Sequence, residues 1–237
     1  MIHWVRGPRT ARQLGLDTVY GLGDPAMLLP LAGWDRVGGG DSVAFMPHFE
    51  SAERGAWVEA AAAAGIELID PRGDPAAIIA AIGRCRVLLS EAMHGAIVAD
   101  ALRVSWIAVQ PLAPTHRAKW HDWADTLDLR VEFHQLAPSS LRERLRASPL
   151  AALHSGFHLL DRFGSALGRL TQGRLIEEAG QSLAAAAAAP PQLSGATALD
   201  RCRTRMLERL EALRREPRQP AALQPCYTAA YHGKSPR

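Results

Sequence analysis

The stretch VLLSEAMHGAIVADAL, residues 87–102, holds the first residues that could do chemistry. An apolar run typical of a strand ends at Ser90, and a helical pattern follows at once, with Glu91 in the expected first turn. Ser90 is a candidate cap for this helix, and Glu91 suits the positive end of its dipole. His94 and Gly95 come next, where free backbone N–H groups bind anions and a residue without a side chain allows close approach.

His94 has two interpretations at this position. It can bind a phosphate or act as a general acid, or it can bond only to a nearby carbonyl. Three further residues could add binding groups for an anion. His48, in FMPHF, lies at the carboxyl end of a predicted strand, and Arg117 and Lys119 lie in PTHRAKWHDW, at the start of a predicted helix. His116 precedes them, and a zinc site built on it is disfavoured because no third ligand is evident.

The segment GLGDPAMLLP indicates a tight turn before an apolar run. It is not a GxGxxG loop and follows no convincing strand, so it gives little support to dinucleotide binding. The sequence shows no Ser-His-Asp pattern, P-loop or paired cysteines, and hydrolase and nucleotide triphosphatase functions therefore lack support.

The elements that must position these residues alternate through residues 1–137. We expect strands at 42–49, 66–70, 86–90, 104–110 and 129–136, and helices at 53–65, 74–85, 91–103 and 115–128. This alternation predicts an α/β fold, a Rossmann-like parallel sheet with flanking helices. In such sheets ligands bind at the carboxyl ends of the strands, where the candidate residues fall.

The rest of the chain differs in pattern. We expect a helical C-terminal extension over 138–183, an Ala/Pro-rich linker over 184–198, a basic amphipathic helix over 199–216 and a disordered tail over 217–237. The basic helix could lie on an anionic membrane, although packing on its own domain is the favoured interpretation.

Composition narrows the class of protein. Of the 237 residues, 48% are hydrophobic, which is enough for a substantial core, and the formal net charge is only +3. This excess suits an anionic ligand or a membrane surface and does not by itself indicate nucleic acid. Three separated cysteines predict neither a disulfide framework nor a metal site, and with no visible signal peptide or membrane span we expect a cytoplasmic protein.

Several segments, taken in order, resemble the polysaccharide pyruvyl transferase family. The similarity is closest to the bacterial exopolysaccharide (succinoglycan-type) ketal pyruvyltransferases and covers roughly residues 2–136. It is carried by HWVRGPRTARQLGL, GLGDPAMLL, VAFMPHF, IELIDPRGDPAAIIAAIGRCRVLLSEAMHGAIVADALRVSWIAV and HRAKWHDWADTLDL. The ordered series is much more specific than any one of these segments.

The resemblance implies a glycosyltransferase-B-like fold with two Rossmann-like domains around a cleft. It implies transfer of pyruvate from phosphoenolpyruvate to a sugar of a polysaccharide repeat unit, forming a cyclic ketal. The acceptor would be a lipid-linked oligosaccharide at the inner face of the cytoplasmic membrane, with possible peripheral membrane contact, no nucleic acid partner and no metal or organic cofactor. The S-x-x-x-H-G element falls on Ser90, His94 and Gly95, with His94 catalytic or donor-binding.

Two departures from the family pattern change these expectations. Some members have an arginine where this chain has Ala92, so Arg117 and Lys119, ahead of Arg6 and Arg9, become the candidate cations for the donor. The usual N-terminal half, with its GNxGD-like opening, is not found, so we expect this chain to hold the donor-side half. Two alternatives therefore stay open: a nucleotide-sugar-dependent glycosyltransferase, and a non-catalytic remnant or binding module.

Overall fold

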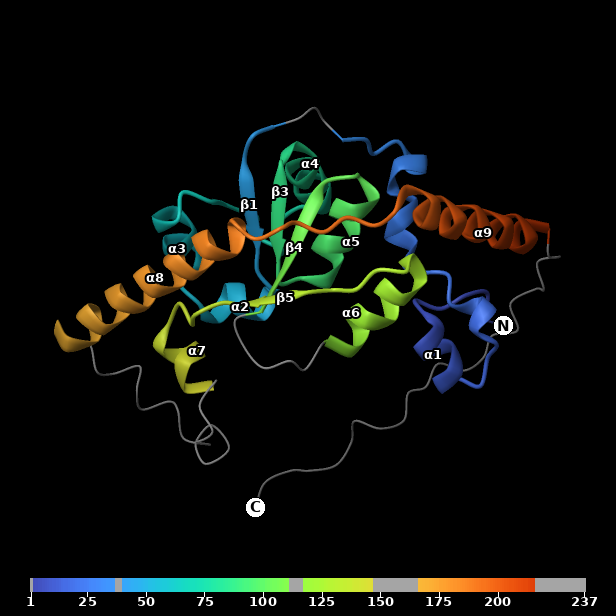
Figure 1. Ribbon diagram of the computed structural model, residues 1–237. Helices are drawn as coiled ribbons and strands as arrows, with labels where there is room; N and C mark the ends of the chain where they lie inside the picture. Colours follow the sequence, from blue (N-terminus) through green and yellow to red (C-terminus); the bar gives the residue numbers. More distant parts are fainter. Residues whose placement is uncertain (1, 37–39, 111–116, 147–165, 216–237) are drawn as a thin grey trace, which may run out of the picture.

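A computed structural model describes residues 2–36, 40–110, 117–146 and 166–215. Its centre is a parallel sheet of five strands in the order β2-β1-β3-β4-β5 (Figure 1). The strands are β1 (Val43–Met46), β2 (Glu67–Leu68), β3 (Val87–Ser90), β4 (Ser105–Gln110) and β5 (Phe133–Gln135). Each lies within a segment predicted as a strand, and the predicted Rossmann-like α/β sheet is confirmed.

Helices connect and cover these strands. The α-helices are α1 (Pro8–Gln13), α2 (Phe49–Arg54), α3 (Trp57–Ala63), α4 (Pro75–Arg84), α5 (Met93–Ala101), α6 (Arg117–Ala124), α7 (Leu141–Arg146), α8 (Ala166–Ala187) and α9 (Ala196–Arg215), and the 3-10 helices are η1 (Thr18–Tyr20), η2 (Pro25–Ala32) and η3 (Asp125–Leu127). The start of α4 is as predicted, because the Asp74 carboxylate accepts from the Ala77 N–H and Pro75 occupies the first turn.

The helix predicted over 53–65 is divided at Gly55, which separates α2 from α3. A Cβ at Gly55 would lie 2.3 Å from the Trp57 ring, so only glycine leaves room for that ring at this turn. Trp57 is buried and packs edge-on against Phe45 of β1. The break therefore lets α3 start with a large residue in the core.

The sheet has a hydrophobic core on each face, because side chains along a strand point alternately to its two sides. Leu88 and Trp106 pack on one face, against α4, α5, α6, α9 and η2. Leu89 and Ile107 pack on the other face, against α3 and α8 (Figure 1). The molecule therefore has three layers, and α8, which was predicted as part of an extension, closes one of them.

The segment predicted as a linker, 184–198, is largely part of the fold. Its alanines continue α8 to Ala187, as the high helix propensity of alanine favours. Further on, the backbone of Gln192 pairs with that of Trp106 in β4, and the Ser194 N–H donates to the buried Asp100 carboxylate. The residues between α8 and α9 are thus packed against the rest of the fold, because their backbone groups find partners on the sheet and on α5.

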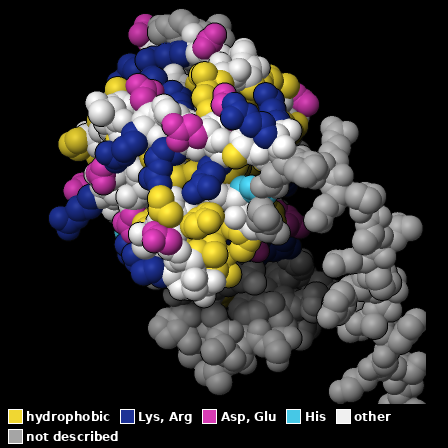
Figure 2. Space-filling model, turned by 90° about the vertical axis from the view of Figure 1, so that its right-hand side faces the viewer, with side chains coloured by type: hydrophobic (Ala, Val, Ile, Leu, Met, Phe, Trp, Pro, Cys, Tyr) yellow, Lys and Arg dark blue, Asp and Glu magenta, His cyan; other side chains and the backbone are white. Residues whose placement is uncertain are grey.

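The basic helix α9 packs on its own domain, as favoured. It begins at Ala196, three residues earlier than predicted, and buries Leu199, Cys202 and Met206. The Arg203 guanidinium donates to the backbone oxygens of Met27 and Ala101. Figure 2, which shows the end of the molecule that carries α9, has basic side chains interspersed with acidic and apolar ones.

Two remaining predictions concern the chain beyond α9 and the membrane. The tail predicted as disordered, 217–237, lies outside the described residues. In the part of the chain that the structure describes, none of the helices combines the length and the apolar character needed to cross a membrane.

Candidate active site

A cavity of about 680 Å³ lies at the carboxyl ends of the strands. Residues from α2, the β3–α5 loop, β4, α6 and β5 form its wall. Four predicted site residues line it together: His48, His94, Arg117 and Lys119. The expectation that the strands' carboxyl ends bring distant polar residues together is met for these four. His116, also predicted, lies outside the described residues.

Ser90 and Gly95 lie behind this wall rather than in it. Ser90 is fully buried and its hydroxyl donates to the Ala92 oxygen at 2.7 Å. It does not cap α5, whose N-cap is Ala92 without a side-chain bond, because the strand runs through Ser90 and the helix begins only at Met93. A Cβ on Gly95 would lie 2.5 Å from the Ser90 Oγ. These two residues therefore shape the loop by close packing.

Glu91 has a different position from the one predicted. It precedes α5, and its carboxylate accepts from the His48 N–H at 2.8 Å and from the Ser51 hydroxyl at 2.9 Å. It thus caps the start of α2, in the neighbouring loop. Burial raises the pKa of Glu91 to about 7, although the bonds from His48 and Ser51 oppose the rise. Because Glu91 also lines the cavity, it is a titratable group near neutral pH inside the candidate site.

His94 is paired with Asp24, a residue that the sequence did not single out. The His94 Nε2 lies 3.3 Å from the Asp24 Oδ2, and Asp24 also accepts from the Ala26 N–H at the start of η2. The hydrogen bond to Asp24 raises the pKa of His94. Burial alone would raise the pKa of Asp24, but the bonds from His94 and Ala26 lower it overall. This pairing favours the imidazolium form, a positive charge at the cavity wall.

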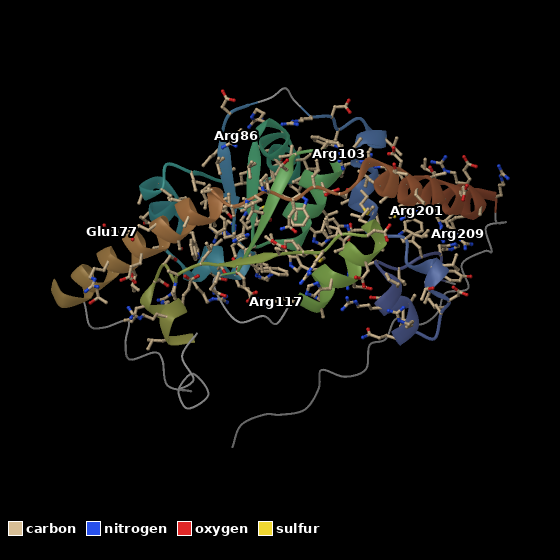
Figure 3. All side chains as sticks on the ribbon, viewed as in Figure 1. Arg86, Arg103, Arg117, Glu177, Arg201 and Arg209 are labelled. Carbon is tan, nitrogen blue, oxygen red and sulfur yellow. The ribbon has the colours of Figure 1, made fainter. Side chains whose placement is uncertain are left out.

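Arg117 and Lys119 bring further positive charge from α6. The Arg117 Nε donates to the Gln110 Oε1 at 2.7 Å, and its guanidinium carbon lies 5.0 Å from the centre of the Phe133 ring. These contacts orient the side chain at the carboxyl-terminal edge of the sheet, opposite Arg86 and Arg103 (Figure 3). Lys119 lies two positions after Arg117 in α6, and its side chain is exposed.

Arg54 is a third cation in the wall that sequence reasoning missed. It ends α2 and pairs with Glu50 at 3.1 Å, while its Nε is buried without a hydrogen-bond partner among the described residues. Its position could not be read from the sequence because the turn at Gly55 decides where α2 ends.

The two arginines ranked behind the α6 cations do not line the cavity. Arg9 pairs with Asp125 at 2.7 Å, away from the site. Arg6 lies 3.7 Å from Asp122, and its charge lowers the pKa of Asp24 and opposes protonation of His94.

The arrangement can hold an anion and exchange protons with it. Cationic groups line the cavity from α2, α5 and α6, and the half-buried carboxyl group of Glu91 lines it too. In the described part of the chain, no three His, Cys, Asp or Glu side chains come together as metal ligands do.

Part of this chain is similar to known proteins. A family model described as polysaccharide pyruvyl transferase matches residues 2–111. The succinoglycan biosynthesis protein ExoV of Rhizobium meliloti (strain 1021) is 38% identical over 145 residues, which cover 61% of this chain and 46% of that protein. The chain thus spans about half the length of this relative. No solved structure matches the chain. Residues 2–111, which hold β1 to β4, Asp24 and His94, are therefore the part of this chain that is similar to the polysaccharide pyruvyl transferase family.

Proposed function

We propose that this chain binds phosphoenolpyruvate in the cavity and transfers its pyruvate group to a sugar of an exopolysaccharide repeat unit, forming a cyclic ketal. The observation that carries the proposal is the meeting of the His94–Asp24 pair with Arg117 and Lys119 around one cavity of a pyruvyl transferase domain. The relative named for succinoglycan biosynthesis supports the polysaccharide as the destination.

The donor explains why the cavity needs several cations. Phosphoenolpyruvate carries a phosphate and a carboxylate on the same carbon, and its phosphate must leave with an electron pair. The His94 imidazolium, held in its charged form by Asp24, faces the phosphate and offsets the charge that develops there. Arg117 and Lys119 hold the carboxylate, in place of the arginine that some family members have at the position of Ala92.

The acceptor in this proposal is a lipid-linked oligosaccharide at the inner face of the cytoplasmic membrane. Two hydroxyl groups of one sugar add to the same carbon of the donor, so the sugar must reach the cavity mouth. Ketal formation needs proton transfer and phosphate departure, which side chains can support. The proposed reaction therefore calls for no metal or organic cofactor.

Calorimetric titration tests the donor directly. We expect the parent protein to bind phosphoenolpyruvate and not a nucleotide sugar, and to release phosphate when lipid-linked oligosaccharide is added. Binding of the nucleotide sugar alone would refute the proposal in favour of a glycosyltransferase. His94→Ala removes a charge-assisted bond worth about 1.5–3 kcal/mol and should weaken phosphoenolpyruvate binding about 10- to 100-fold. His134→Gln, which changes a histidine outside the cavity wall, is the matched control.

A further inference from the structure

We propose that Glu91 is the acid that gives its proton to the methylene carbon of the enol phosphate, a role that rests on the proposed function. The phosphate cannot leave until the carbon that bears it becomes electrophilic, and protonation of the neighbouring carbon achieves this. The proton donor must be neutral in the donor complex and must lie in the wall that the donor contacts. Among the described residues that line the cavity, one combines these properties.

Two acidic residues line the cavity in the described part of the chain, and Glu91 is less exposed to solvent than Glu50. Glu50 is 48% exposed and pairs with Arg54. The Glu91 carboxyl group is held from two sides, by the His48 N–H and the Ser51 hydroxyl, and follows directly on the end of β3. It is therefore a fixed group in the cavity wall, three residues before His94.

The surroundings favour the neutral acid. The charges of Glu143 in α7 and Arg54 in α2 act on Glu91. The other titratable and charged residues that line the same cavity are His48 and Glu50 at the start of α2, His94 in α5, and Arg117 and Lys119 in α6. Burial raises the pKa of Glu91 most, the bonds from His48 and Ser51 oppose it, and the charge of Glu143 adds to the rise while that of Arg54 opposes it. An anionic donor brings more negative charge and favours the protonated form further.

The proposed step balances with the sugar as co-reactant. The Glu91 proton and the π electrons of the donor's double bond form a C–H bond, which converts the methylene to a methyl group and leaves the adjacent carbon electrophilic. A sugar hydroxyl oxygen adds there and returns its proton to Glu91. The bond to phosphate breaks with its electron pair moving to the phosphate. The second hydroxyl oxygen adds, and its proton leaves with the phosphate.

This step gives the two proton-bearing groups separate tasks. His94 is bonded to Asp24 and serves as a cation, so its proton is committed to that pair. Glu91 loses and regains a proton in each cycle. A carboxyl group that titrates near neutral pH suits this exchange, because neither form is strongly favoured.

Proton uptake on binding tests the first part of the proposal. The full chain is titrated with phosphoenolpyruvate at about pH 8 in buffers of different ionisation enthalpy. We expect the parent to take up protons on binding. Glu91→Gln should bind the donor at least as tightly with less uptake, while Glu53→Gln, on the exposed side of α2, should match the parent. Equal uptake by the parent and Glu91→Gln would overturn the proposal.

Turnover with lipid-linked oligosaccharide tests the second part. Loss of a general acid should lower kcat of Glu91→Gln at least about 100-fold, with KM for phosphoenolpyruvate unchanged or lower. The parent's kcat/KM for phosphoenolpyruvate should decline above about pH 7, because this ratio reports the pKa of the acid in the free protein, and it can be measured even if the variant fails to fold. A variant with the same kcat as the parent, or a parent kcat/KM that rises through this pH range, would refute the role of Glu91 but leave the proposed function in place. A parent that does not bind phosphoenolpyruvate would refute the proposed function as well.

Discussion

Replacement of Glu91 by glutamine should change how the stability of the protein depends on pH. The pKa of this carboxyl group is about 7 in the folded protein and 4.5 ordinarily. Between these values the folded state keeps the proton while the unfolded state has lost it. The parent's free energy of unfolding should therefore fall as pH rises from about 4.5 to 7, and the loss should level off above that.

The structure sets the size of this effect. Each unit of difference in pKa corresponds to about 1.4 kcal/mol, so an ionised Glu91 lowers stability by about 3 kcal/mol at high pH, to order of magnitude. Glutamine stays neutral and has nearly the same shape. Its oxygen can accept from the His48 N–H and its amide can donate to the Ser51 hydroxyl, so both contacts with α2 can persist. Glu91→Gln should match the parent at about pH 4 and exceed it by up to about 3 kcal/mol at about pH 8.

Denaturant unfolding across this pH range measures the difference. The buried Trp57, Trp106 and Trp123 provide a fluorescence signal, and Glu53→Gln serves as a control for the loss of an exposed carboxylate. The reasoning requires the variant and parent curves to separate as pH rises. Parallel curves from pH 4 to 8, or a variant less stable than the parent at about pH 8, would show that Glu91 is not held as a neutral acid.

Three further substitutions test other contacts. Asp24→Asn should lower the pKa of His94 toward its ordinary value, and an NMR titration showing no change would contradict the pairing. Gly95→Ala brings a Cβ to 2.5 Å from the Ser90 Oγ and should cost about 1–3 kcal/mol of stability, part of which Ser90→Ala should restore; additive losses in urea unfolding would argue against the contact. Asp100→Ala leaves the Trp106 indole N–H without its acceptor and should cost about 3 kcal/mol, measured by thermal and urea unfolding, whereas a neutral effect would count against this network.

Local signals were enough to predict the sheet and part of the site. The apolar run that ends at Ser90 marks a strand, and Asp74-Pro75 marks a helix start, because each signal depends on adjacent residues. The rule that parallel strands present their carboxyl ends at one edge then placed His48 and His94 near each other.

The partners of the site residues could not be predicted in this way. Glu91 meets His48 because Met46 of β1 lies opposite Ser90 of β3, a register that sequence spacing does not specify. Asp24 reaches His94 only because η2 packs against α5. Both contacts depend on tertiary packing, whereas the sequence around Glu91 pointed to its own helix.

The position of α9 affects the order in which the molecule can be completed. Strands β1 to β4, Asp24 and His94 all lie within residues 2–110. Arg203 of α9 connects the two helices that hold this pair, because it donates to η2, which begins directly after Asp24, and to the last residue of α5, the helix that contains His94. These contacts bridge 176 and 102 residues of sequence. During synthesis the sheet can form while one of its apolar faces still awaits α9, and such exposed faces are prone to aggregation. Arg203 can therefore hold η2 and α5 together only after α9 has been synthesised.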